Sequence, residues 1–310
     1  MILKNFFDPK KTSKLIGYTE KFEFFKKFIS KDNFPNVIMI TGDKGIGKFT
    51  FINHFMHFYF DKKNYNEQEK SFNLRSPFND QYQNNLFPNI IHLSGDNFRN
   101  IKIDDVRKLK SDLLKKTINN NKRFIILDDV EIFNINSLNA LLKLIEEPGA
   151  SNHFILINNK TKPLIDTIKS RCVEIKFILT NSIRNKIIDF LSEYFDQDII
   201  IEKDLVKISP GNFLKFNFMF GDKKIDITED FLENVNKILN LYKKEKNIFY
   251  KDLVLFFIEY YMQKNRSHEF FNLKILKNRT YLIKNINNFF FHSLNQNTLL
   301  TSIENKILNE

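Results

Sequence analysis

The segment Lys122-Arg-Phe-Ile-Ile-Leu-Asp-Asp129 decides how the rest of the sequence is interpreted. Its centre, Phe124 to Leu127, is uninterrupted apolar, as in a strand of a parallel sheet that is buried on both faces. The run ends in Asp128 and Asp129, and ligands bind at the carboxyl edge of such a sheet. This segment therefore predicts an α/β fold with a functional site that includes acidic side chains at a strand end.

Helix and strand signals alternate on both sides of this segment. A leucine-rich helix is predicted from residue 137 and ends at Pro148-Gly149, and residues 153–157 predict a second buried strand. Further strand signals begin at Val37, Ile90 and Val173. These five strands, with helices between them, predict an α/β domain with a mostly parallel sheet.

A glycine-rich loop, Gly42-Asp-Lys-Gly45-Ile-Gly47-Lys48, follows the predicted strand at 37–40. Three of the eight glycines of the chain lie in this loop, which indicates unusual backbone angles. Strand, glycine-rich loop and helix form the P-loop arrangement, in which backbone N–H groups hold phosphates and the lysine reaches the terminal ones. We therefore expect a phosphate-binding site, with a vestigial loop that binds nothing as the alternative. Its predicted residues are Gly42, Gly45, Gly47 and Lys48.

The residue after the lysine departs from the P-loop pattern. A serine or threonine is expected there, because its hydroxyl binds Mg²⁺, but the chain has Phe49, with Thr50 one residue later. One residue is about 100° around a helix, so Thr50 is expected to point away from the metal. The pattern predicts phosphate binding with poor magnesium-assisted hydrolysis.

Several short motifs follow one another in an order and spacing typical of one protein family. They are Asp128-Asp129, Asn139-Ala-Leu-Leu-Lys143, Glu146-Glu147-Pro148, Phe154-Ile155, Thr167-Ile168 and Ser170-Arg171-Cys172. With this series the chain resembles the clamp-loader branch of the AAA+ ATPases, and within it most closely the delta-prime subunits of bacterial DNA polymerase III. The resemblance extends from about residue 16 to residue 177, a little over half of the chain.

The resemblance implies roles for the polar side chains at the strand ends. Asp128 occupies the position that holds Mg²⁺ through water in an active relative, and Asp129 that of the glutamate that activates the attacking water. Aspartate is one methylene shorter, and a misplacement of about 1 Å can cost about a hundredfold in rate. Asn158 and Asn159 take the place of the polar sensor for a γ-phosphate. The alternative for the acid pair is an ordinary acidic strand end.

Arg171 is the most specific site that the resemblance implies. In the family, the arginine of Ser-Arg-Cys reaches across the subunit interface as an arginine finger and stabilises charge on ATP held by the neighbour. The alternative is an arginine in an ordinary salt bridge.

Glu146 and Glu147 lie at the C-terminal end of their predicted helix, where negative charge costs about 0.3–1 kcal/mol each. We expect a cation in the domain or on a partner to offset this cost.

The sequence predicts three domains: an AAA+ α/β P-loop domain at 1–178, a small helical lid at 179–222 and an all-α collar domain at 223–310. The spacing is helical from about residue 180. By resemblance, the collar joins subunits into a ring. The lid helix of relatives carries an arginine that senses nucleotide, but around Gly211 this chain has Asn212 and Lys215 instead.

Composition limits the compartment and the cofactors. With one cysteine, no signal peptide and no long apolar run, we expect a cytoplasmic protein without disulfides or membrane contact. The resemblance implies a comparison here: bacterial relatives commonly insert a four-cysteine zinc module where residues 62–85 of this chain have Asn, Gln, Tyr and Phe. No zinc or other metal site is therefore expected. The net charge of +11 would suit nucleic acid, but the lysines are spread over the whole chain, which favours a lysine-rich surface without a binding role.

The predicted function is that of a delta-prime-like subunit that helps to load a sliding clamp on primed DNA during replication. Its own ATPase activity is expected to be weak or absent, and its binding of ATP or ADP weak or vestigial. The expected partners are gamma/tau-like ATPase subunits and delta, with the clamp and primed DNA encountered within the complex. Two alternatives remain: an active gamma-type ATPase, and a stand-alone AAA+ module that binds DNA or another protein.

Overall fold

The computed structural model describes residues 8–95, 101–114, 117, 121–227, 230–247, 249–264, 272–292 and 294–308. The chain divides into two compact units, and each is described by itself. The N-terminal unit contains residues 1–188 and 209–211, and the C-terminal unit contains residues 189–208 and 212–310. The predicted division into three domains at 178 and 222 stays a prediction.

Five strands form the central sheet of the N-terminal unit, in the order β4-β5-β6-β1-β7. They are β1 (Val37–Thr41), β4 (Ile90–Ser94), β5 (Arg123–Asp128), β6 (Asn152–Asn158) and β7 (Val173–Lys176). Every neighbouring pair is parallel. All five strands predicted from the sequence are present, and the α/β fold class is confirmed.

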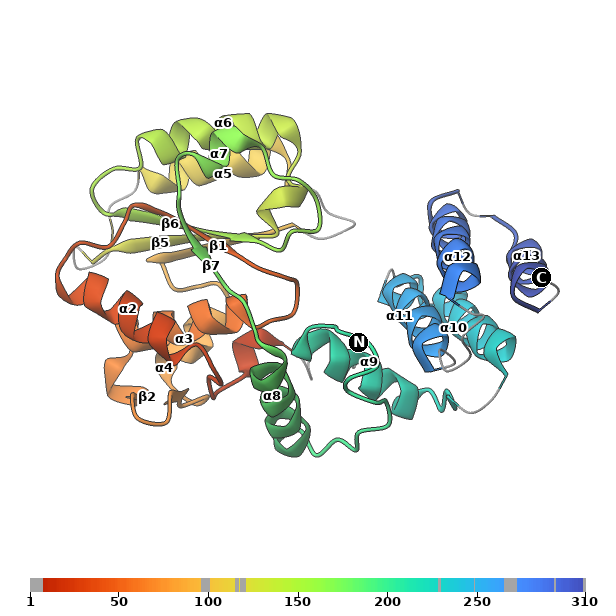
Figure 1. Cartoon of the computed structure of the whole chain (residues 1–310). Coiled ribbons are helices and arrows are strands. Elements are labelled where there is room, and N and C mark those ends of the chain that lie inside the picture. The colour runs from red at the N-terminus through yellow and green to blue at the C-terminus, as the bar shows by residue number, and fades with distance from the viewer. Residues whose placement is uncertain are drawn as a thin grey trace. The chain divides into compact units, whose positions relative to one another are not determined.

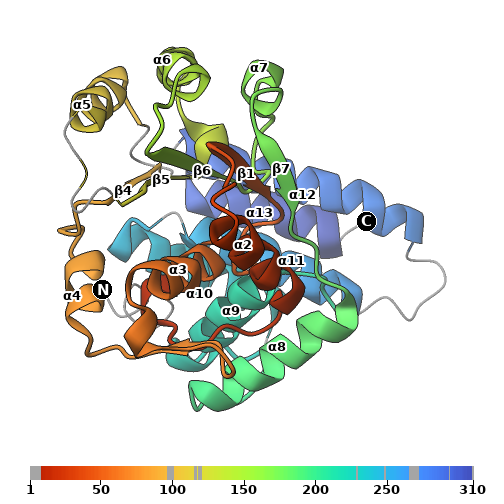
Figure 2. The same ribbon diagram turned by 90° about the vertical axis from the view of Figure 1, so that its left-hand side faces the viewer.

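Helices cover both faces of this sheet (Figures 1 and 2). One face carries α5 (Ile103–Leu113), α6 (Ile135–Glu146) and α7 (Asp166–Lys169), and the other carries α2 (Thr19–Ser30), α3 (Lys48–Phe60) and α4 (Pro77–Gln83). Short 3₁₀ helices lie at η1 (Pro9–Lys11), η2 (Lys62–Asn64) and η4 (Val130–Ile132).

The two faces of the sheet belong to two separate hydrophobic cores. In β5, Phe124 and Ile126 belong to the core that includes α2, α3 and α4, whereas Ile125 and Leu127 belong to the core that includes α5 and α6. A strand with both faces buried needs an apolar side chain at every position. This explains why β5 was recognisable as an uninterrupted apolar run.

The segment at 62–85 contains a small hairpin, β2 (Tyr65–Asn66) paired with β3 (Ser71–Phe72), and helix α4. Its buried hydrophobic side chains are aromatic, and the ring of Phe72 stacks on His57 of α3 with ring centroids 3.7 Å apart. Aromatic packing thus anchors this segment to α3. Among the described residues, no group of three or more His, Cys, Asp or Glu side chains is arranged to hold a metal ion.

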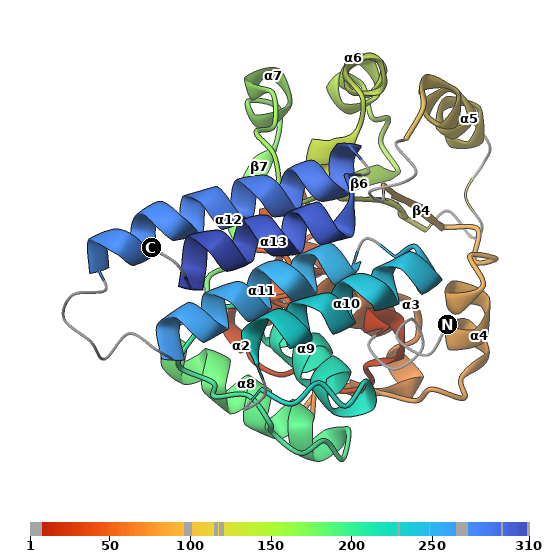
Figure 3. The same cartoon turned by 90° about the vertical axis from the view of Figure 1, so that its right-hand side faces the viewer.

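The C-terminal unit is helical (Figure 3). Four consecutive helices pack on one another: α10 (Phe231–Glu245), α11 (Phe249–Lys264), α12 (Asn272–His292) and α13 (Gln296–Leu308). The division between the units falls within α8 (Asn181–Tyr194) and α9 (Pro210–Asp222). No helix in the described ranges combines the length and the apolar composition needed to cross a membrane.

Candidate functional site

The glycine-rich loop connects β1 to α3 at the carboxyl edge of the sheet. Gly42 has no room for a side chain, because a Cβ atom there would lie 2.5 Å from the carbonyl oxygen of Phe177. Gly47 precedes α3 with a φ of 93°, a left-handed conformation that favours glycine. The carbonyl oxygen of Gly45, between them, accepts the N–H of Gly211 at 3.0 Å. The loop conformation depends on glycines that the sequence pattern singled out.

Lys48, the first residue of α3, is held by the loop that precedes it. Its Nζ donates to the carbonyl oxygens of Gly42, at 2.6 Å, and Asp43, at 2.7 Å. These bonds use two of the three ammonium N–H groups and leave one for a ligand. Burial lowers the pKa of Lys48 to about 8, and nearby carboxylates, Asp128 first among them, oppose this shift. At neutral pH the group is therefore mainly cationic.

Phe49 and Thr50 follow Lys48 and are both half-buried. The ring of Phe49 packs against His92 of β4, with ring centroids 4.9 Å apart. The side chain after the lysine therefore contributes to the packing of α3 on the sheet and offers no hydroxyl to a metal ion. Thr50 lies about 100° further around the helix.

The acid pair at the end of β5 lies beside the loop. The Nζ atom of Lys44 is 3.6 Å from the Asp129 carboxylate. Asp129 has a left-handed backbone with a φ of 54°, and its N–H donates to the carboxylate of Asp128 at 2.9 Å. Burial raises the pKa of Asp128 to about 6, and the charge of Asp129 adds to the shift. The structure thus brings the acid pair and the loop with Lys48 into one site.

Asn159, rather than Asn158, contacts the acid pair. Its Nδ2 donates to Asp129 at 2.7 Å and lies 3.4 Å from the carboxylate of Asp128. The side-chain oxygen of Asn158 accepts the N–H of Lys160 at 2.9 Å and so shapes the turn that follows β6. Of the two asparagines that the sequence placed at the sensor position, the geometry favours Asn159.

Glu131 belongs to the same site and was not predicted. It is buried, and its carboxylate accepts the N–H of Asn159 at 3.1 Å, the N–H of Thr161 at 3.2 Å and the hydroxyl of Thr161 at 2.7 Å. One side chain therefore fixes the turn that carries Asn159. The available signal was a glutamate in an otherwise apolar segment, Val130 to Phe133, directly after the acid pair.

Arg171 lies outside this group of residues, at the opposite edge of the sheet. It comes two residues before Val173, which pairs with Ile38 near the start of β1, whereas the glycine-rich loop follows the end of β1. Its Nε donates to the carboxylate of Glu146 at 2.7 Å, and its Nη1 donates to the carbonyl oxygen of Thr167 at 2.9 Å. Arg171 therefore supplies the cation that was expected beside Glu146.

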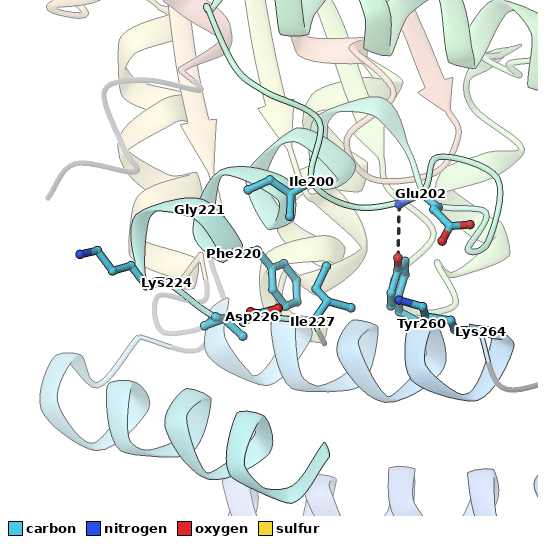
Figure 4. Close-up of a pocket in the computed structure, with 10 residues that line it drawn as sticks. Ile200, Glu202, Phe220, Gly221, Lys224, Asp226, Ile227, Tyr260 and Lys264 are labelled. Atoms are coloured by element: carbon cyan, nitrogen blue, oxygen red, sulfur yellow. Dashed lines mark hydrogen bonds between the residues drawn. The ribbon is translucent and has the colours of Figure 1, made fainter. Parts of the chain in front are cut away.

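The C-terminal unit contains a cavity of about 530 Å³ (Figure 4). It is bounded by residues 200–202, by α9 and residues 224–227 that follow it, and by α11. The N–H of Glu202 donates to the hydroxyl of Tyr260 at one side of this cavity, at 3.4 Å. The remaining lining residues are Ile200, Phe220, Gly221, Lys224, Ile225, Asp226, Ile227 and Lys264. The lining is mixed apolar and charged and includes neither histidine nor cysteine, so we assign no reaction to it.

Known proteins similar to this chain are subunits of DNA polymerase III. A subunit delta' from Pseudomonas aeruginosa is 28% identical over 140 residues, which are 45% of this chain and 42% of that protein. A subunit gamma from Buchnera aphidicola is 26% identical over 165 residues, which are 50% of this chain and 44% of that protein. The chain thus spans less than half of the length of these curated relatives.

A solved structure shares the fold. The gamma subunit-related protein of Thermotoga maritima superposes with a TM-score of 0.52 and 16% identity, over 91% of this chain and 96% of that chain. Residues 17–180, more than half of the chain, match the family model described as DNA polymerase III, delta subunit. This range includes the loop, the acid pair, Asn159 and Arg171, so the resemblance carried by the sequence motifs is confirmed. The chain therefore belongs to the DNA polymerase III delta subunit family.

Proposed function

We propose that the chain works as a delta-prime-type subunit of a DNA polymerase III clamp loader and contributes Arg171 to ATP bound by a neighbouring subunit. Its partners are then gamma- or tau-type ATPase subunits and delta, in a cytoplasmic complex that loads a sliding clamp on primed DNA. The family match and the curated relatives named as subunits delta' and gamma support this assignment.

The position of Arg171 carries the proposal. β1 has five residues, and a strand rises about 3.3 Å per residue, so its two ends are roughly 16 Å apart. Lys48 lies beyond one end of β1, and Arg171 lies beyond the other, just before β7, which pairs with β1. Arg171 therefore cannot contact phosphates held by the loop of its own chain. An arginine placed in this way suits a role in trans, where it stabilises charge on a transferring phosphoryl group.

The residues of the loop fit the phosphates of a nucleotide. The backbone N–H groups of the loop, the N-terminus of the 13-residue helix α3 and the remaining N–H of Lys48 are the groups that hold phosphates in P-loop proteins. They fit Mg²⁺ less well, because Phe49 provides no hydroxyl and Asp129 is hydrogen-bonded to Asn159. A bound ATP would supply the phosphoryl group for hydrolysis. We infer that this chain holds nucleotide weakly and hydrolyses it little or not at all.

An active gamma-type ATPase is the second candidate. It is favoured by Lys48, which is placed across the loop with one N–H available, and by the likeness to a gamma subunit. A steady-state ATPase assay on the isolated chain separates the two candidates, because only the gamma-type assignment requires turnover without partners.

The test of the proposed function is a complex reconstituted from the chain and the cognate gamma-type, delta and clamp proteins. Arg171→Ala is expected to assemble normally, because an exposed ion pair contributes about 0–1 kcal/mol to stability. It should lower the clamp- and DNA-stimulated ATPase activity by roughly tenfold. This loss is smaller than the 10³–10⁵-fold of GTPase arginine fingers, because other sites in the ring keep their own fingers.

Two further variants complete the design. Arg171→Lys keeps the charge but lacks the planar fork, so it should restore little of the activity. Arg107→Ala, which removes an exposed arginine paired with Asp104 on α5, is the matched control and should leave the rate unchanged. If the Arg171 variants assemble and hydrolyse ATP at the wild-type rate, the role in trans is wrong.

A further inference from the structure

The last residue of α6, Glu146, carries a carboxylate at the end of the helix where the dipole disfavours it. Its Oε1 atom accepts from Nε of Arg171 at 2.7 Å and lies 2.6 Å from Nη2 of the same guanidinium. The side chain of Glu146 is 44% exposed and that of Arg171 is 38% exposed. An ion pair this exposed contributes little to the stability of the fold. Its main consequence is to determine where the guanidinium of Arg171 lies.

The guanidinium is fixed from two directions. Glu146 lies on the side of Nε and Nη2, and the carbonyl oxygen of Thr167 accepts from Nη1 at 2.9 Å. A guanidinium has five N–H groups in one plane. Nε–H and one N–H of Nη2 are directed to Glu146, and one N–H of Nη1 is directed to Thr167. Nη1 and Nη2 therefore each retain one further N–H. These two donors are available to an oxygen from outside the chain.

We propose that Glu146 is a positioning residue for Arg171: it holds the guanidinium so that the remaining terminal N–H groups meet a phosphate oxygen of ATP on the neighbouring subunit. This inference rests on the proposed function of Arg171 in trans. A long flexible side chain loses conformational entropy when it binds, and a group that is already held in place loses less. Glu146 therefore acts before the partner arrives.

A positioning role and a purely electrostatic role of Glu146 predict opposite results. If the carboxylate mainly repelled the incoming phosphates or competed with them for Arg171, its removal would raise the activity. If it positions Arg171, its removal lowers the activity. Glu146→Gln retains one oxygen acceptor for Nε of Arg171, whereas Glu146→Ala retains none, so the glutamine variant should keep more activity.

The experiment uses the same reconstituted complex, with ATP as the ligand. Glu146→Ala is expected to lower the stimulated kcat for ATP by about threefold, with KM little changed. This loss is smaller than the roughly tenfold loss of Arg171→Ala, because the arginine is misplaced rather than removed and Thr167 still holds Nη1. Glu146→Gln should lose less. Glu147→Ala, at the adjacent exposed position, is the matched control and should leave kcat unchanged. The double variant Glu146→Ala with Arg171→Ala should be no slower than Arg171→Ala alone.

A spectroscopic measurement on the isolated chain tests the geometry without any activity. The ¹⁵N-correlated signal of the Arg171 Nε–H should be protected from solvent exchange in the wild type, retained in Glu147→Ala and broadened in Glu146→Ala. If Glu146→Ala did not assemble into the complex, the kinetic test would be made with Glu146→Gln.

The outcomes separate this inference from the proposed function. An unchanged rate for Arg171→Ala would overturn the role in trans, and the positioning role with it. A loss for Arg171→Ala together with an unchanged or raised rate for Glu146→Ala would overturn the positioning role alone. Losses in both, with a smaller loss for Glu146→Gln and none for Glu147→Ala, support it.

Discussion

Replacing Glu131 by alanine tests whether one buried carboxylate holds the turn after β6. Glu131 is 4% exposed and accepts three hydrogen bonds from Asn159 and Thr161. Thr161 is exposed, so water can replace the bonds that it loses. Asn159 is buried, and its N–H would be left without an acceptor. The cost of the substitution therefore falls mainly on one backbone group.

The magnitude follows from that group. A buried N–H without a partner costs about 1–3 kcal/mol. The cavity left by the shortened side chain adds to this cost, whereas removal of a buried carboxylate acts in the opposite direction because its desolvation penalty disappears. We expect Glu131→Ala to lower the free energy of unfolding by about 2 kcal/mol. For a unit of this size, this corresponds to a decrease of about 4–8 °C in the melting temperature.

The assay is urea and thermal unfolding of the full chain, with the transition of the N-terminal unit followed by circular dichroism. Glu131→Gln keeps one acceptor oxygen and should lose about half as much. Glu147→Ala removes an exposed carboxylate and should stay within about 0.5 kcal/mol of the wild type. If Glu131→Ala also stayed within this limit, Glu131 would not hold the turn, and the position of Asn159 would need another explanation.

Two further predictions concern the acid pair and the loop. Burial raises the pKa of Asp128 from 3.8 to about 6, so between these values the folded protein retains a proton that the unfolded chain releases. The free energy of unfolding of the wild type should therefore fall relative to that of Asp128→Asn as the pH rises from about 4 to about 6. Urea titrations of both proteins over this range measure the difference between their free energies of unfolding. A difference that stays constant would contradict the raised pKa of Asp128. The isolated chain should hydrolyse ATP far more slowly than the roughly 1–100 s⁻¹ typical of kinases, because Phe49 supplies no metal ligand. A measured turnover within tenfold of that range would favour the gamma-type alternative.

The centre of the sheet could be predicted from the sequence because β1, β5 and β6 are buried on both faces. A run such as Phe124 to Leu127 must be apolar at every position, and this pattern is visible without any knowledge of the neighbouring strands. The hairpin of β2 and β3 was not predicted, because each strand has two residues and leaves no periodic signal. Its stability comes from rings such as Phe72 on His57, a contact between separate elements.

The composition of the candidate site could be predicted only in part. The glycines and Lys48 were recognisable because they are adjacent in the chain and their spacing reflects one loop. Glu131 and Asn159 are 28 residues apart, and their contact depends on β5 and β6 being neighbours in the sheet. The sequence pattern predicted the two strands but not which strands would be paired.

Glu146 and Arg171 pair because both lie at the amino edge of the sheet, away from the carboxyl edge where the glycine-rich loop lies. The sequence contained both a misplaced carboxylate and an arginine motif, but these residues are 25 positions apart and nothing in their spacing joins them. In a parallel sheet, residues that follow strands gather at the carboxyl edge, and residues that precede strands gather at the amino edge. Glu146 ends the helix before β6, and Arg171 precedes β7, so both lie at the amino edge, whereas Lys48 and Asp128 lie at the carboxyl edge. One chain thus has the glycine-rich loop at one edge of the sheet and the Arg171–Glu146 pair at the other. Under the proposed function, the arginine meets a phosphate on another subunit.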